Sequence, residues 1–183
     1  MKRNFFAFFF ALAVAAPTSS ALAETSTRCS EAGPGAAFCT GSTFSRIDAG
    51  VTEGLSFWLD RAGYLSKVLV QADPDGDADQ ATIESQILAM VSRQATDIGR
   101  EFEFSDATST TAGGAPFGTL SYSLAQEGQD QKILHSYVAV KGIVIQVISQ
   151  IALKGAAKDP EALMMAHHRA LDAIELINRD AAL

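Results

Sequence analysis

The chain has 183 residues, of which 14 are basic and 21 are acidic, so its formal net charge is −7 at neutral pH. An acidic chain without a basic cluster argues against binding to nucleic acid or to an anionic membrane surface. The part that follows the leader described next has the length of one ordinary domain, enough to bury a core of its own.

The first 23 residues, Met1 to Ala23, have the features of a secretory signal peptide. Lys2 and Arg3 precede an apolar run of 12 residues, Phe5–Ala16, and the segment ends in the small-x-small pattern that signal peptidase cuts. A spanning helix needs about 20 apolar residues, so the run is too short for a permanent anchor. We predict cleavage after Ala23 and a soluble, periplasmic product that is not inserted in the membrane.

Cys29 and Cys39 are the only cysteines, and the segment between them is rich in Gly, Pro and Ala. In an oxidising compartment such a pair forms a disulfide, and closing so short a loop stabilises the fold by about 2–3 kcal/mol. The alternative is a redox or metal pair, but the Cys-x-x-Cys spacing and a nearby histidine are both missing. We therefore predict an irregular, disulfide-stapled arm at 24–43, followed by a single domain at 44–183.

The domain is predicted to begin with a hairpin, because aromatic and branched residues at Leu55–Leu59 and Tyr64–Val70 flank a turn that contains Gly63. A helix follows, with Asp79 or Thr82 as its cap and Gly99 just past its end. Its apolar stripe is Ile83, Ile87, Met90, Val91, Ala95 and Ile98.

Four further strands and a closing helix are predicted after that. Phe102 and Phe104 alternate with polar residues, and a small-residue loop is expected at 108–116. The next strands are Thr119–Ala125, Lys132–Val140 and Ile143–Leu153, the last apolar on both faces and therefore central in the sheet.

The closing helix, Pro160–Asn178, has Asp159 as its cap and Pro160 at its first position. Its apolar stripe is Leu163, Ala166, Ala170, Leu171, Ile174 and Ile177. The element order is ββαββββα. It predicts an α+β domain in which two amphipathic helices cover a single, mostly antiparallel six-stranded sheet.

This element order, from the hairpin 55–70 to the closing helix, resembles the architecture of the PsbP family of photosystem extrinsic subunits. A Ran-binding import factor and bacterial DcrB-like envelope proteins share that architecture. The resemblance covers roughly residues 44–178 and rests on the order of elements, with no motif specific to the photosystem subunits. It implies a non-catalytic binding or accessory module.

The strongest local motif is an acidic loop at 73–84. Asp73, Asp75, Asp77 and Asp79 occupy positions one, three, five and seven of a 12-residue loop, and Glu84 occupies position twelve. This is the ligand spacing of an EF-hand calcium loop, in which the seventh residue gives its backbone carbonyl. However, position six is Ala instead of Gly, and a strand precedes the loop. The alternative is a solvated strand-to-helix turn in which Asp79 caps the helix.

The histidines do not form a metal motif. His167 and His168 point about 100° apart on a helix, so one metal ion does not fit both. We expect His167 to pack at the edge of the apolar stripe with its polar tip in water. His135 lies in the middle of a strand, and the sequence does not determine which face of the sheet it is on. Glu101 and Glu103 are expected on an exposed polar face.

No catalytic residues are identified: a Gly-x-Ser-x-Gly elbow, a phosphate loop and a zinc signature are all missing. We therefore predict a soluble accessory protein without catalytic machinery or cofactor, which binds a protein of the cell envelope through an exposed sheet face or through the loop 108–116. The alternatives are a calcium-binding envelope domain that uses loop 73–84, and an enzyme whose active site is assembled from distant residues.

Overall fold

The computed structural model describes residues 27–73, 75–76, 78–97, 99–126, 129–151 and 159–177. The predicted signal peptide with its cleavage point at Ala23, and Asp77 of the acidic loop, lie outside these residues. Within the described ranges, no helix has both the length and the apolar character needed to cross a membrane.

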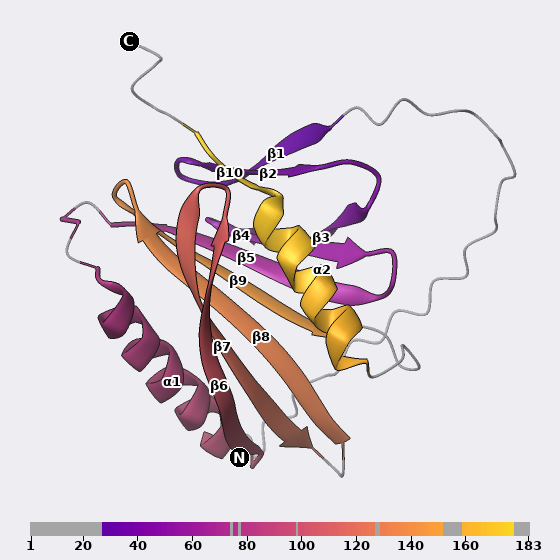
Figure 1. Ribbon diagram of the computed structural model, residues 1–183, viewed down its shortest axis with the longest axis vertical. Coiled ribbons are helices and arrows are strands. Elements are labelled where there is room, and N and C mark those ends of the chain that lie inside the picture. Colours follow the sequence, from indigo (N-terminus) through magenta and orange to yellow (C-terminus); the bar gives the residue numbers. More distant parts are fainter. Residues whose placement is uncertain are drawn as a thin grey trace, which may run out of the picture.

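The main layer is an antiparallel sheet of seven strands in the order β3-β4-β5-β9-β8-β7-β6 (Figure 1). Its strands are β3 (Phe44–Thr52), β4 (Leu55–Asp60), β5 (Tyr64–Ala72), β6 (Glu101–Ala112), β7 (Ala115–Gln126), β8 (Gln129–Val140) and β9 (Ile143–Ile151). The predicted hairpin is β4–β5, and β9 is the central strand, as its apolar sequence indicated. The prediction of a single six-stranded sheet was wrong. β3 adds a seventh strand to this sheet, and three other strands form a second sheet.

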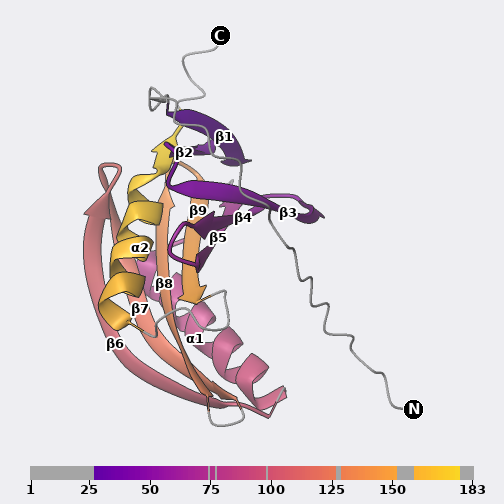
Figure 2. The ribbon, with the colours of Figure 1, turned by 90° about the vertical axis from the view of Figure 1, so that its right-hand side faces the viewer.

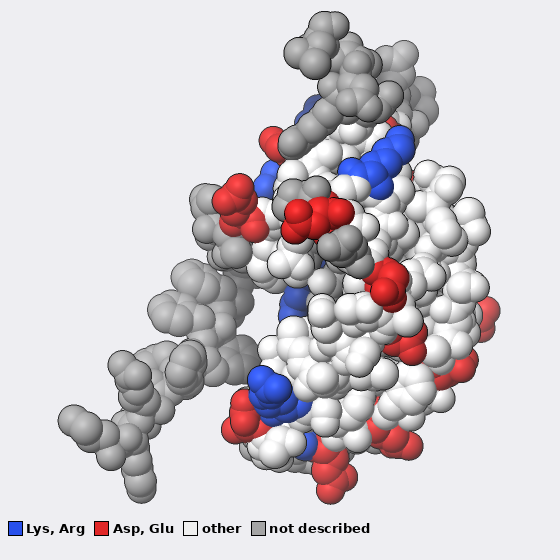
Figure 3. Space-filling model, turned by 90° about the vertical axis from the view of Figure 1, so that its left-hand side faces the viewer, with Lys and Arg blue, Asp and Glu red and all other residues white. Residues whose placement is uncertain are grey.

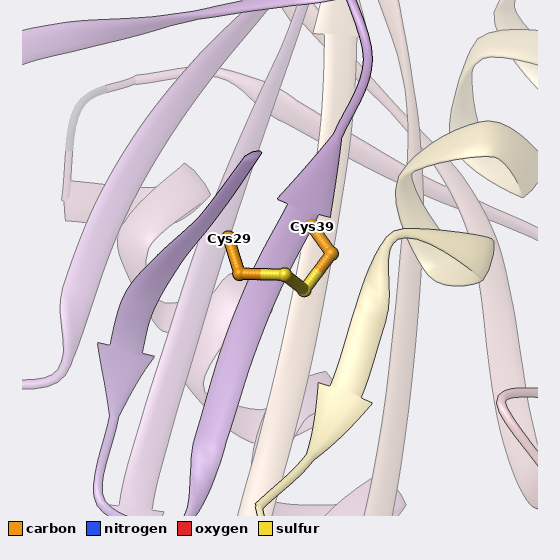
Figure 4. Close-up of a disulfide and its surroundings, with 2 residues drawn as sticks. All are labelled: Cys29 and Cys39. Atoms are coloured by element: carbon orange, nitrogen blue, oxygen red, sulfur yellow. A yellow bond between two sulfur atoms is a disulfide. The ribbon is translucent and has the colours of Figure 1, made fainter. Parts of the chain in front are cut away.

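The second sheet has the order β1-β2-β10 and contains β1 (Arg28–Gly33), β2 (Ala36–Thr40) and β10 (Ile174–Leu176). The segment predicted to be an irregular arm is thus a hairpin, stabilised by pairing with a strand from the other end of the chain. Cys29 and Cys39 lie directly opposite each other on β1 and β2 and form the predicted disulfide (Figure 4). In the described part of the chain neither thiol is free.

The closing helix, α2, runs from Pro160 to Asp172 and ends earlier than predicted. The amide of Cys39 donates to the carbonyl oxygen of Ala173 at 2.7 Å, and Ile174 then pairs with Phe38. Ile174 and Ile177 were assigned to the helical stripe but lie in β10 and just beyond it. Their spacing fits a helix, yet the unpaired edge of β2 offers backbone hydrogen bonds that a longer helix would leave unmade.

The two helices lie on opposite faces of the seven-stranded sheet (Figure 2). α1 (Gln80–Asp97) packs on Leu120, Ile133 and Tyr137, whereas α2 packs on the other face, mainly against β9, β8 and β5. Asp79 caps α1 and Gly99, at φ +67°, ends it, as predicted. Four stripe residues of α1 are buried, but Met90 is exposed; the buried ones are Ile83, Ile87, Val91 and Ala95.

The small sheet is fixed to the large one by aromatic packing on the α2 face. Phe38 of β2 is fully buried, and its ring stacks on Trp58 of β4 with centroids 4.3 Å apart. Phe44 meets the ring of Phe38 edge-on, with centroids 5.5 Å apart. Burying each of these side chains contributes about 1.5–3 kcal/mol, so the N-terminal hairpin is part of the core.

Gly118 provides a test of the packing on the α1 face. A Cβ atom placed there would lie 2.6 Å from Cζ of Tyr137, and that ring is held in place because its hydroxyl donates to Glu84 of α1. We expect Gly118→Ala to lower the free energy of unfolding by about 1–3 kcal/mol, the usual cost of overpacking. The control is Gly41→Ala, because no atom lies within 4 Å of a Cβ at Gly41. Urea unfolding of both variants checks this, and equal losses would contradict it.

Candidate functional site

A β-bulge in β6 decides which residues face α2. Phe104 pairs with Tyr122 on the α1 side, and the register then shifts before Asp106, which pairs with Ser121. Without the shift, the even-numbered residues that follow would remain on the α1 side. The extra residue turns them over, so Asp106, Thr108 and Thr110 face α2.

The prediction of a loop at 108–116 was wrong, because this segment is the tip of a hairpin formed by β6 and β7. Only Gly113 and Gly114 form a turn, and the flanking residues belong to β6 and β7. Small β-branched and hydroxyl-bearing residues suit a strand as well as a loop, which is why composition alone misassigned them.

A groove of about 630 Å³ lies between α2 and the β6–β7 hairpin. The sheet side is lined by hydroxyl-bearing side chains, namely Ser105, Thr108, Ser109, Thr110, Thr119 and Ser121. The helix side is lined by Pro160, Glu161, Met164, His167 and His168, and Lys132, Leu134 and Asp106 complete the wall. The groove thus offers neutral hydrogen-bond donors and acceptors, apolar contacts from Leu134, Met164 and the methyl groups of its threonines, and charged side chains of both signs.

Under one wall of the groove, a chain of buried and half-buried polar side chains joins α2 to four strands, β5, β7, β8 and β9. Nδ1 of His167 lies 2.8 Å from Oγ of Ser149, and Nε2 lies 2.7 Å from Oγ of Ser136. Ser149 continues to Ser66 at 2.9 Å, and Ser136 continues to the half-buried Thr119 at 2.6 Å. The chain therefore runs from the middle of the sheet to the groove.

This network corrects the expectation for His167. Its side chain is only 1 % exposed, so the polar tip is not in water, and the serines supply both of its hydrogen bonds. Serine is small enough to leave room for an imidazole between helix and sheet. Burial lowers the pKa of His167 to about 3, so the ring is neutral, with one nitrogen donating and the other accepting.

The contact between Ser136 and His167 has the distance of a nucleophile and its general base, but its setting differs. A hydrolytic triad orients the histidine with a carboxylate, and here a serine hydroxyl holds that position. Ser136 is also fully buried, so a substrate carbonyl has no access to Oγ. The geometry supports a role in holding α2 on the sheet.

His135 lies on the opposite face, toward α1, and is fully buried. Its Nε2 donates to Oε1 of Gln146 at 3.0 Å, and its Nδ1 accepts from the hydroxyl of Tyr122 at 3.4 Å. Burial lowers its pKa to about 4. His135 and His167 are thus separated by the sheet, whereas His168 is exposed in the groove.

In the acidic loop, three of the four described carboxylates have structural partners. Asp79 accepts from the amide of Thr82 at 2.8 Å, which lowers its pKa, and its carbonyl accepts from the amide of Ile83. Glu84 accepts from the hydroxyl of Tyr137, and Asp73 accepts from the amide of Ala78. Asp75 is exposed.

Across the described residues, one group of three metal-binding side chains comes within 4.8 Å: Cys29, Cys39 and Glu175, of which the cysteines are bonded to each other. Calcium binding at Asp73, Asp75, Asp77, Asp79 and Glu84 therefore remains a prediction from the sequence.

The surface of α2 beside the groove is partly apolar. Met164 and Met165 are 48 % and 55 % exposed, so α2 presents apolar side chains outward. Glu101 and Glu103 are exposed, as expected. On the side of the molecule in Figure 3, the described Lys and Arg side chains are scattered among acidic ones and form no continuous basic patch.

This architecture is similar to that of several solved structures. The solution structure of cyanobacterial PsbP (CyanoP) from Synechocystis sp. PCC 6803 has a TM-score of 0.60 and 13 % identity, covering 87 % of this chain and 98 % of that one. The fold is PsbP-like. The structure of a mutant of protein Mog1 has a TM-score of 0.56 and 8 % identity, covering 85 % of this chain and 98 % of that one. No protein-family model matches the sequence, and no curated protein matches it either.

The two buried histidines predict how stability depends on pH. Both have folded pKa values well below about 6.5, the value in an unfolded chain, so below that pH the unfolded state binds more protons. Their contribution is complete above pH 6.5 and declines as the pH falls toward 4 and 3. Each contributes a slope of up to about 1.4 kcal/mol per pH unit.

Urea unfolding at pH 7 and pH 5 measures that slope. His167→Asn is expected to reduce this slope by the contribution of one proton, about 1.4 kcal/mol per pH unit. Equal slopes for the wild type and His167→Asn would contradict the assignment of a buried, neutral imidazole.

The calcium prediction is tested by thermal melting with about 1 mM calcium or with chelator. Binding to the native state must raise the melting temperature, whatever the site's detailed geometry. Asp75→Asn removes an exposed candidate ligand and should abolish the increase. An unchanged melting temperature in calcium would rule out a site that is occupied outside the cell.

Proposed function

We propose that this protein is a soluble, exported accessory protein, which binds a partner protein of the cell envelope in the groove between α2 and the β6–β7 hairpin. The observation that carries the proposal is the groove itself. It is about 630 Å³ in volume, hydroxyl-bearing side chains line its sheet side, and regular secondary structure forms both of its sides.

The compartment is supported by two independent features. The disulfide between Cys29 and Cys39 is typical of proteins that fold in an oxidising environment, such as the periplasm. The leader Met1–Ala23 has the composition of an export signal. The accessory role agrees with the PsbP-like fold, although a fold alone does not determine function.

The chemistry of the groove favours a protein segment with polar and apolar side chains over a nucleotide or another strongly charged ligand. Among the described residues that line the groove, Lys132 is the only Lys or Arg, and the negative charges of Asp106 and Glu161 offset its positive charge. Thr108 and Thr110 can hydrogen-bond to amides and carbonyls alike, while Leu134 and Met164 offer apolar contacts. Such mixed, largely neutral surfaces are common in transient protein interfaces.

No catalytic role is assigned to the groove. His167 has both ring nitrogens in hydrogen bonds, and the serines that it contacts are buried. His168 is the exposed imidazole of the groove, and the described hydrogen bonds do not connect it to a hydroxyl nucleophile. Binding is therefore the function that this geometry supports best.

The test uses a photo-reactive amino acid at Met164 in cells. We expect a cross-link to an envelope protein, and we expect Thr108→Arg to reduce its yield at least tenfold by filling the groove. Thr111→Arg is the matched control, because Thr111 is also exposed on β6 but does not line the groove. Equal yields for both variants, or no protein cross-link while the purified protein turns over a substrate, would contradict the proposal.

A further inference from the structure

Among the described elements, α1 covers only part of the face of the sheet on which it lies. α1 packs on β6, β7 and β8, at one end of the strand order. A helix is about 10 Å across and strands are about 4.8 Å apart, so one helix covers two or three strands. The opposite end of the same face, formed by β3, β4 and β5, extends beyond the reach of α1.

That end of the face is apolar. Cross-strand pairing places Leu59 beside Leu65, Leu55 beside Leu69, and Phe57 beside Ile47. All six side chains alternate with the residues that face α2, and they lie outside the three buried clusters of the described core. Five are half-buried, and Ile47 is 38 % exposed. We call this surface the β3–β5 face.

Lys67 lies on β5, between Leu65 and Leu69, where the β3–β5 face borders β9. It lies directly opposite Phe57 on one side and Ile148 on the other. Its diagonal neighbours on β4 and β9 are Leu55, Leu59, Gln146 and Gln150. None of these residues is acidic, and the ion pair found among the described side chains joins Arg169 to Asp60 and does not involve Lys67.

An ammonium group among apolar side chains is poorly solvated, and burial lowers the pKa of Lys67. Partly desolvated charges in proteins are normally paired, because an unpaired one destabilises the fold. An apolar surface of this kind, with one uncompensated charge on its innermost strand, has the composition of an interface whose other half carries the opposite charge.

We propose that the β3–β5 face binds an amphipathic α-helix of a partner protein, and that this helix places one Asp or Glu against Lys67. The helix would lie beside α1 and continue the layer that α1 begins. The width of the uncovered strands matches one helix, and its apolar stripe would cover the leucines and Phe57. This surface lies on the opposite side of the sheet from the α2 groove, so the inference is independent of the proposed function.

The experiment places a photo-reactive phenylalanine analogue at Phe57, in the full chain and in cells, and identifies the cross-linked peptide by mass spectrometry. The same analogue at Gln94, an exposed position on α1, reports background. We expect a cross-link at Phe57 that maps to a helix with an acidic residue in its apolar stripe, and no such cross-link at Gln94.

Lys67→Glu is expected to reduce the yield at least tenfold by charge repulsion. Lys67→Met is the second variant, because it keeps the length of the side chain, removes the unpaired charge and should fold with at least wild-type stability. It should also lose most of the cross-link. The control Lys141→Glu reverses an exposed charge in a turn and should change nothing.

Three results would overturn the proposal: no protein cross-link at Phe57, a cross-link to lipid or to a segment of this same chain, or a yield that Lys67→Met leaves unchanged in a variant that melts like the wild type.

Discussion

The two hydrogen bonds of His167 are the interaction on which the architecture depends. They join the middle of α2 to Ser136 of β8 and, through Ser149 of β9, to Ser66 of β5. All four side chains are essentially buried, so water cannot replace a lost partner. An unpaired buried group costs about 1–3 kcal/mol, which makes the network an all-or-none constraint on the position of the helix.

The position of α2 on the sheet determines how the small sheet and the groove are formed. Toward its C-terminal end, α2 is held by the ion pair between Arg169 and Asp60 and by the bond from Cys39 to Ala173. β10 then joins the disulfide-bonded hairpin, so both ends of the domain are locked in the small sheet. On its outer side, α2 forms one wall of the groove opposite β6 and β7. The same network that stabilises the fold therefore sets the width of the proposed binding site.

The sequence predicted well what depends on local signals. The caps at Asp79 and Asp159, the stop at Gly99 and the central position of β9 follow from short-range backbone chemistry and from apolar patterning, and all four agree with the structure. The PsbP-like arrangement follows from the order of these elements. What the sequence missed depends on distant partners. The sequence of β10 has helical spacing, but its residues pair with the edge of β2 instead. The bulge in β6 has no sequence signal of its own. The serines that surround His167 come from three different strands, and only the register brings them together.

Amide hydrogen exchange in a Ser136→Ala, Ser149→Ala double variant tests the central claim most directly. Alanine removes both partners of His167 without adding bulk. If the network anchors α2, its amides should lose protection while those of α1, on the other face, keep theirs. Unchanged protection of α2, or an equal loss in both helices, would contradict the account.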